Sequence, residues 1–265
     1  GASVARNRLG VSSDGPDASG DGLAIGASVR GHDGQAGVKS LVAQSLTLKA
    51  DQTSTIDATV GATSAAIAWT GKGSVGVAAS GAGSEATNTL KQNVTAEVLG
   101  AGEGATLTLG NGDLTLSAND TSSLTTTAWG AALAVSVAPA AQFSAAPAVG
   151  LSLADNTLIR RQKAALQGFR RDGNGLGGVG SAGAVAITSG STGRIQATSV
   201  AVAIAAAAAK DLAVGLSGGG AHSFNTILGT NQALIEDSDL GVDSAPIAGT
   251  LTVRATDSTT IDSEV

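Results

Sequence analysis

The stretch Asp113-Leu-Thr-Leu-Ser-Ala-Asn-Asp-Thr-Ser-Ser-Leu124 decides the fold, because close copies of it recur along the chain. Residues 45–56 and 250–261 repeat its pattern, and residues 184–195 carry a weaker copy. The copies start at Ser45, Asp113, Ala184 and Thr250, which gives a nearly constant period of about 68 residues. Recurrence at a nearly fixed spacing predicts a repeat architecture, in which each repeat packs on its neighbours.

A second landmark, Asn-Thr-Leu or a close variant, recurs with the same period and begins at Asn7, Asn88, Asn156 and Asn225. Asparagine tolerates the left-handed backbone conformation and bonds to its own backbone, so we interpret these four residues as structural turn formers. The two landmarks divide one repeat domain, residues 1–265, into a partial unit 1–44, the units 45–112, 113–183 and 184–249, and a partial unit 250–265.

Apolar and polar residues alternate within each copy, as in Leu114, Leu116 and Ala118. Alternation with period two predicts β-strands, which we expect to be about five to eight residues long. The Ala-rich segment 199–216 could instead form a helix, because alanine has the highest helix propensity. Its Val and Ile residues, and the strand-like equivalents in the other copies, favour a strand.

The composition favours a fold with a narrow interior. Of 265 residues 38 are Gly, aromatic residues make up 2%, and Cys and Met are absent. Small side chains stack well inside a parallel β-solenoid, whose coils lie about 4.8 Å apart. We expect each repeat to form three coils of roughly 23 residues, or two longer ones, which gives a rod of about 55 or 40 Å.

The copies share the order Leu-Thr-Leu, a Thr/Ser run, Ile-Asp-Ala, a Gly/Ala/Val strand and Ala-x-Asn-Thr-Leu. In this order they resemble the repeat regions of giant bacterial exoproteins, the filamentous-haemagglutinin-like and leukotoxin-type filamentous adhesins. The resemblance covers essentially the whole chain. It implies a right-handed parallel β-helix (β-solenoid) that serves as a stalk in a secreted or surface-anchored bacterial protein.

Charge and composition argue against several classes of protein. The formal net charge of −6 argues against a nucleic-acid-binding protein, which needs a basic surface. Without Cys the chain has no disulfide, thiolate metal ligand or Cys nucleophile. The longest apolar run, residues 200–209, is shorter than the ~20 residues that a membrane-spanning helix needs. We therefore expect neither a nucleic-acid partner nor a membrane span.

The distance from each Asn landmark to the next block varies, so we expect insertions to leave the repeat at one recurrent place. The larger lies within residues 10–37 and the smaller near residues 168–183. A basic cluster begins just before the smaller one and consists of Arg160, Arg161, Lys163, Arg170 and Arg171. Guanidinium groups pair bidentately with anions, so this cluster is a candidate site for an anionic glycan or an acidic subunit. A solvated loop face is the alternative.

The sequence shows no assembled catalytic or metal site. His32 and His222 are the only histidines, and neither belongs to a recognisable catalytic pattern. An acidic turn could take one Ca²⁺ ion, but the tandem nonapeptides of calcium-binding solenoids are missing. The residues of that turn are Glu236, Asp237, Asp239 and Asp243. We predict no enzyme and no cofactor, with a polysaccharide-degrading β-helix enzyme as a weaker alternative.

Repeats without an assembled site predict a structural or adhesive module of a bacterial extracellular or cell-surface fibre. The chain opens on the later part of a unit and closes on the first part of one. We expect it to be either a piece of a longer array or a subunit that stacks head to tail. Neighbouring copies of the same protein are then its main partners, with an anionic glycan as the other candidate.

Overall fold

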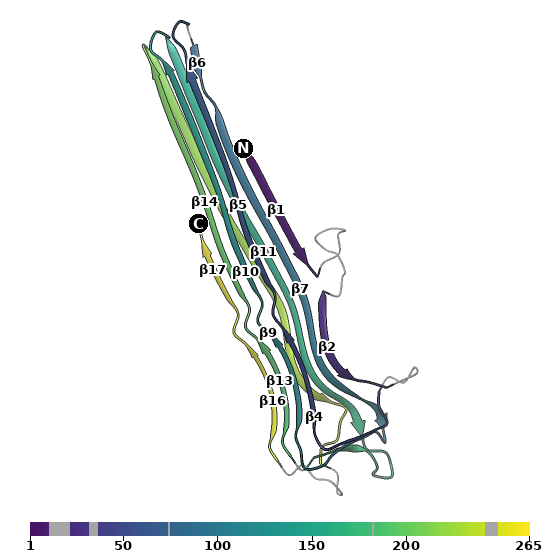
Figure 1. The fold of residues 1–265 in the computed structure, drawn as a ribbon. Coiled ribbons are helices and arrows are strands. Elements are labelled where there is room, and N and C mark those ends of the chain that lie inside the picture. The colour runs from purple at the N-terminus through teal and green to yellow at the C-terminus, as the bar shows by residue number, and fades with distance from the viewer. Residues whose placement is uncertain (11–21, 32–36, 74, 182, 242–248) are drawn as a thin grey trace.

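The computed structural model describes residues 1–10, 22–31, 37–73, 75–181, 183–241 and 249–265. All regular secondary structure in these ranges is β-strand, and paired strands are parallel (Figure 1). The prediction of an all-β fold with parallel sheets is therefore confirmed. The alternative helix over residues 199–216 is absent, because these residues belong to strands β14 (Arg194–Ala209) and β15 (Leu212–Glu236).

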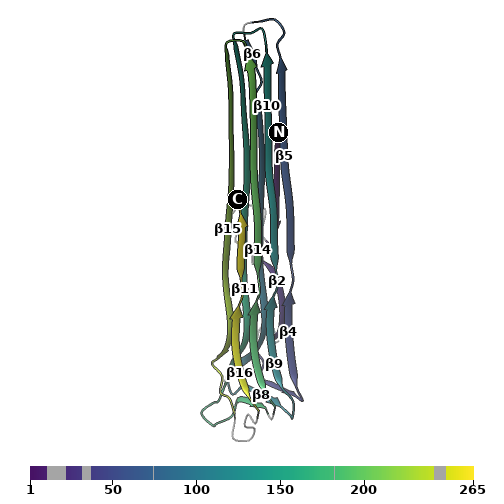
Figure 2. The same cartoon turned by 90° about the vertical axis from the view of Figure 1, so that its left-hand side faces the viewer.

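Two layers of strands face each other along a tall arm (Figures 1 and 2). The first, which we name the β11 layer, has the order β1 (Ala2–Leu9), β7 (Ser80–Glu103), β11 (Phe143–Arg170) and β15, with β2 (Leu23–Val29) on β7 and β6 (Val75–Val77) on β11. The second, the β10 layer, contains β5 (Thr55–Trp69), β10 (Ser123–Ala138), β14 and β17 (Thr260–Glu264). Short turns at the tip of the arm, such as residues 139–142 and 210–211, connect the two layers.

At the opposite end the chain turns a corner and forms a wider base (Figure 2). One sheet of the base leads into the β10 layer and consists of β4 (Leu46–Gln52), β9 (Leu114–Asp120), β13 (Val185–Ser191) and β16 (Leu251–Asp257). A small sheet at the corner consists of β3 (Ser40–Ala43), β8 (Thr106–Leu109) and β12 (Gly178–Ser181). The base holds the large core side chains, among them Leu107, Leu166 and Phe169, all fully buried.

Each strand pairs with the equivalent strand of the next repeat. Leu114 lies beside Leu46 on one side and beside Val185 on the other, and Val185 lies beside Leu251. These offsets equal the spacings between the copies in the sequence. Each repeat therefore contributes one strand to each main sheet, and successive repeats stack on one another. Below, a layer of the stack means one such repeat, whereas the β10 layer and the β11 layer are the two facing sheets.

The expectation of two or three coils per repeat is wrong. Four stacked strands span only about 14 Å from first to last, whereas the 28 residues of β11 follow a path of roughly 90 Å. The long dimension of the molecule therefore lies along the strands, and the described layers do not form the expected rod of many short coils. The reason is that glycines such as Gly81 and Gly150, a residue type that commonly marks turns, lie within the long strands β7 and β11.

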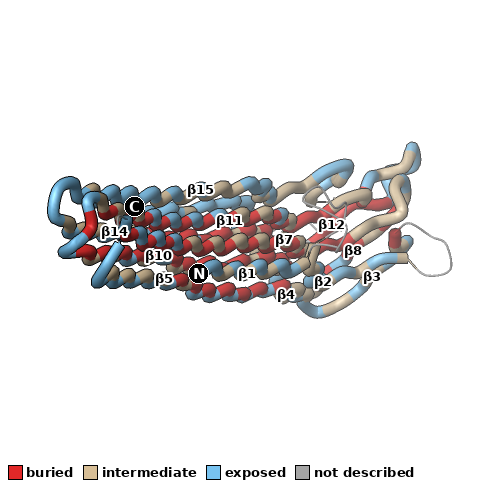
Figure 3. The backbone as a smooth tube through the Cα atoms, turned by 90° about the horizontal axis from the view of Figure 1, so that it is seen from above, coloured by how far each residue is buried: buried red, intermediate tan, exposed pale blue. Residues whose placement is uncertain are grey.

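Small inward-facing residues allow the two layers of the arm to approach closely. Ala132, Ala134 and Ala148 fill the space between the layers, and inward-facing buried residues alternate with more exposed ones along the central strands β10 and β11 (Figure 3). Glycine occupies the tightest positions. A Cβ atom on Gly130 would lie 2.3 Å from the carbonyl oxygen of Leu151 in the facing layer. The spacing of the layers, and not strand propensity, therefore selects glycine here.

We predict that Gly130→Ala lowers the free energy of unfolding by about 1–3 kcal/mol, although alanine normally costs less conformational entropy than glycine. The added methyl group would overlap backbone, which cannot move aside as a side chain can. Gly83→Ala is the matched control, because nothing lies within 4 Å of its added Cβ. Urea unfolding followed by circular dichroism measures both variants, and equal stabilities would contradict the close approach.

Candidate functional site

A continuous row of asparagine side chains runs through the stack where the arm meets the base. Asn7, Asn88, Asn156 and Asn225 occupy equivalent positions in β1, β7, β11 and β15. The Nδ2 atom of each donates to the Oδ1 atom of the next, at 2.8, 2.9 and 2.8 Å. Asn88 and Asn156 are completely buried. The row therefore satisfies buried amides by bonding each to its equivalent in the next layer, as in the amide ladders of stacked β-structures.

The interpretation of these asparagines as turn formers is wrong. All four lie within strands, and Asp237 is the only non-glycine residue with a positive φ in the described ranges. The sequence does contain a signal for the correct placement. Ala86, Asn88 and Leu90 are two residues apart, so the alternation of an inward-facing row passes through the asparagine.

A second buried polar centre surrounds Arg160, whose side chain is 1% exposed. Its Nη1 atom lies 3.7 Å from Oδ2 of Asp120, and its Nη2 atom lies 3.6 Å from Oδ2 of Asp257. Nη2 also donates to the Thr259 hydroxyl. Gln162 donates to Asp120 at 3.1 Å. A buried guanidinium requires such partners, because an unpaired charge in the interior is strongly destabilising.

Glycine at position 193 makes room for this guanidinium. A Cβ atom on Gly193 would lie 2.2 Å from Nη1 of Arg160. In the preceding layer the equivalents of Arg160 and Gly193 are Gln92 and Ser122, and the Gln92 side-chain amide is hydrogen-bonded to the Ser122 hydroxyl. The large Arg160 opposite Gly193 thus takes the place that the smaller Gln92 opposite Ser122 has in the preceding layer. Arg160 and Gly193 therefore form a pair of complementary size within the core, where a ligand cannot reach them.

Burial raises the pKa of the Asp120 carboxyl above its usual value, because desolvation penalises the charged form. Hydrogen bonds from the Ser122 side chain and the charge of Arg160 oppose this increase, as does the bond from the Ser122 backbone. The folded protein therefore binds this proton more tightly than the unfolded chain does.

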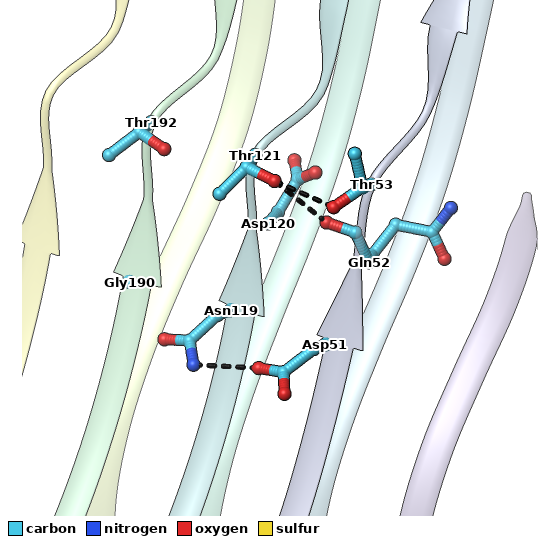
Figure 4. A pocket seen from close by; sticks show the side chains of 8 residues that line it. All are labelled: Asp51, Gln52, Thr53, Asn119, Asp120, Thr121, Gly190 and Thr192. Carbon is cyan, nitrogen blue, oxygen red and sulfur yellow. Dashed lines mark hydrogen bonds between the residues drawn. The ribbon is translucent and has the colours of Figure 1, made fainter.

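A hollow of about 350 Å³ lies on the outside of the molecule where β4, β9 and β13 end (Figure 4). The Nδ2 atom of Asn119 donates to Oδ1 of Asp51 at 2.8 Å, and the hydroxyls of Thr53 and Thr121 lie 2.8 Å apart. These bonds connect equivalent positions in adjacent layers. The lining therefore combines amide, hydroxyl and carboxylate groups that are engaged with one another, without a nucleophile next to a base.

The predicted basic cluster does not form one surface patch, because Arg160 is buried in the core. Arg161 and Lys163 lie on the outer side of β11, and Arg170 and Arg171 lie at the corner of the base. Lys163 and Arg170 are 3.6 and 3.9 Å from carboxylates of the neighbouring strand β7. Arg171 donates to a backbone carbonyl at 3.0 Å. Sequence proximity alone could not show this division, because it depends on which face of β11 each residue occupies.

The two insertions leave the repeat at different places, which corrects the expectation of one recurrent place. Leu9 pairs with Leu90 and Leu23 pairs with Gln92, so the first insertion leaves the middle of the β11 layer. The second lies at the corner of the base, between β11 and β12. Residues 11–21 and 32–36, which include His32, lie outside the described residues.

The predicted acidic turn is only partly described, because Asp243 lies outside the described residues. Glu236 accepts a hydrogen bond from Gln167, and Asp239 accepts one from the backbone of Arg171 at 2.7 Å. Within the described ranges no group of three or more His, Asp or Glu residues could hold a metal ion. His222 lies in β15, a strand and not a turn.

Comparisons with family models, with curated proteins and with solved structures give no match to this chain. Among the described residues no helix is long and apolar enough to cross a bilayer. Function must therefore be inferred from the geometry of the stack itself.

The pair of Arg160 and Gly193 predicts that Gly193→Ser lowers the free energy of unfolding by about 1–3 kcal/mol through overpacking against Arg160. Arg160→Gln should also destabilise, because it leaves Asp120 and Asp257 without their cation. The double variant recreates the pair of the preceding layer and should be more stable than the sum of the single effects predicts. Denaturant unfolding of all four proteins measures this coupling, and additive effects would contradict it.

The raised pKa of Asp120 predicts a pH dependence of stability. Between the pKa of the unfolded chain, about 4, and the higher folded value, only the native state retains the proton. Asp120 therefore makes the free energy of unfolding fall as pH rises through this window. We expect Asp120→Asn to gain stability relative to the wild type as pH increases from about 4 to 7. A difference in free energy of unfolding between Asp120→Asn and the wild type that stays constant from about pH 4 to 7 would contradict the raised pKa of Asp120.

Proposed function

We propose that the chain is a non-enzymatic structural module of a bacterial extracellular or cell-surface fibre. In this proposal the repeats wind as a right-handed β-solenoid with one coil per repeat. The surface location and the winding follow from the resemblance of the repeats to filamentous adhesins, and the geometry of the stack supports a structural role.

The observation that carries the proposal is that buried polar groups bond to their own equivalents in adjacent layers. The asparagine row crosses all four layers, and on the exposed surface Thr53 with Thr121 and Asp51 with Asn119 also bond between equivalent positions of adjacent layers. A further repeat with asparagine at the equivalent position would extend the asparagine row without changing any contact already made. The core thus specifies stacking itself, which is what a fibre requires.

The outermost strands leave backbone groups open for another layer. Among the described strands, β5 has a neighbour only on the β10 side, and β15 has a neighbour only on the β11 side. The asparagine row also has a direction, since each amide nitrogen donates towards the C-terminal layer. The amide of Asn225 at one end and the amide of Asn7 at the other are therefore complementary in a head-to-tail stack.

The alternative of anionic-glycan binding is less well supported. It requires a common basic surface, whereas Arg160 is buried and its neighbours lie on two separate parts of the molecule.

We predict that the chain forms unbranched fibres at high concentration, with an axial rise of about 19 Å per chain for four layers. Asn225→Lys should abolish the fibres, because stacking would bury an unpaired ammonium group in the asparagine row. Thr226→Lys is the matched control, since the adjacent residue of the same strand faces outward like its equivalent Thr157. Negative-stain microscopy reports the outcome, and a wild-type chain that stays monomeric at millimolar concentration would refute head-to-tail stacking.

A further inference from the structure

The outer surface of the β10 layer changes from polar to apolar at one height. Below it the outward residues include Thr125 and Thr127 on β10. From Trp129 towards the tip the outward residues of β10 are apolar, and those of the next strand include Val202 and Ile204, which are 47% and 56% exposed. We name this surface, formed by the outward residues of β5, β10 and β14 above that height, the β10 face.

The opposite side of the arm shows the same change. On β11 the outward residues Val149 and Leu151 are 49% and 48% exposed, and the next outward residue towards the base, Leu153, lies between Glu85 of β7 and His222 of β15. On β15 the outward surface includes Leu212 and Leu216. We name this surface, formed by the outward residues of β6, β7, β11 and β15 above Leu153, the β11 face.

Contacts across the core show that the two changes occur at the same height. The Ser199 hydroxyl donates to the carbonyl oxygen of Ser152 at 3.1 Å. Ser199 pairs with Ala128 in the register of the β10 layer, so Trp129 and Leu151, the next residues of β10 and β11 towards the tip, lie at nearly the same level of the arm. The arm is therefore a thin slab with a small-residue interior and two apolar outer faces of equal extent.

Each face is as large as the largest apolar patch of a typical monomer, which is often a functional surface. Three strands about 4.8 Å apart and about nine residues long give a footprint of roughly 400 Å² before side-chain relief is counted. Monomeric proteins seldom expose larger contiguous apolar patches, and such patches mark interaction surfaces. Two faces of this size on opposite sides of one slab are therefore candidate interaction surfaces.

We propose that a second copy of this chain covers these faces, with the β11 face of one copy lying on the β10 face of the next and the arms parallel. Because the apolar zones of the two faces begin at the same height, a second copy displaced sideways without rotation makes this contact. Its apolar zone then lies on the apolar zone of the first copy, and its polar zone on the polar zone. The contact is heterologous, so it propagates into rows of side-by-side arms.

The relief of the β10 face fits such a partner. A hollow of about 320 Å³ lies between the large side chains of Leu133, Val202 and Ile204 and the small ones of Ala65 and Ala131. The large outward side chains Val149 and Leu151 on the β11 face of a neighbour supply groups of the size that would fill it.

The size of the contact indicates rows in preference to closed dimers. Each face presents about fifteen outward residues, and a stable interface uses about 20–30 residues per partner. A single contact is therefore smaller than a standard stable interface, and a copy inside a row makes two such contacts, whereas a copy in a dimer makes one. A bilayer would also cover apolar faces, but it would leave the backbone of the edge strands β5 and β15 unpaired in hydrocarbon. Side-by-side copies leave those edges in water.

The test uses the Asn225→Lys background, which removes end-to-end stacking. Trp69 and Trp129 are the only tryptophans, both belong to the β10 face, and the chain has no Tyr, so intrinsic fluorescence reports on this face directly. We expect the sedimentation coefficient to rise with concentration and the emission to shift to the blue in parallel. The pair Leu133→Lys with Val202→Lys should weaken association more than about tenfold, since the contact would bury ammonium groups without partners. Thr125→Lys with Gln196→Lys, on the same strands below the apolar zone, should change nothing.

A mixing experiment tests the heterologous geometry. The variant with Leu133→Lys and Val202→Lys retains its β11 face, and a variant with Leu151→Lys retains its β10 face. Mixed together, they should form 1:1 dimers that do not extend, while neither associates alone; circular dichroism establishes that both fold. Self-association of the Leu151→Lys variant would overturn the proposal in favour of contact between two β10 faces. Flotation of monomeric protein with phosphatidylcholine vesicles, with a blue shift but no self-association, would overturn it in favour of lipid.

Discussion

Parallel stacking of nearly identical repeats in strict register is the constraint on which the rest of the structure depends. Because each residue lies beside its equivalent, every inward position becomes a row, and the chemistry of the row must be compatible with itself. Apolar rows satisfy this condition by contact, and the asparagine row satisfies it by amide hydrogen bonds of 2.8–2.9 Å. A carboxylate row would repel itself, so Asp120 is followed by Ser191 at the next layer, while Arg160 supplies the compensating charge.

The arm inverts the usual distribution of side-chain size. In most domains large apolar residues fill the core and small or polar ones cover the surface. Here alanine, serine and glycine lie between the layers, and Ile67, Trp69 and Leu216 are exposed by 75%, 72% and 63%. The base keeps the ordinary arrangement, with Leu107 and Phe169 buried. Most of the large-residue burial that stabilises the described fold is therefore concentrated at one end, and the arm depends on backbone pairing and close layer contact.

The sequence was sufficient for the repeat, its period and the parallel strands, because these follow from spacing and alternation alone. It was not sufficient for the number of coils per repeat, since the observed period is compatible with one, two or three coils. The deciding factor is a tertiary one: Gly130 and Gly150 lie in strands because the facing layer approaches them, and the same residues considered locally suggest turns. Asn88 departs from expectation for a related reason, as its local preference for turns is overridden by its bonds to the equivalent asparagines of the adjacent layers. The burial of Arg160 depends on Asp257, which lies far along the chain, and no local pattern signals that pairing.

The pair formed by Arg160 and Gly193 fixes which repeat stacks on which. Repeats that resemble one another so closely could also pair with the alignment shifted by one repeat, because the backbone hydrogen bonds would be the same in the shifted stack. A chain displaced by one layer would bring the long guanidinium against a serine in place of the glycine and move it away from its carboxylates. One mismatched position therefore penalises the whole slipped alignment, so the order of the repeats along the chain is also fixed as their order in space.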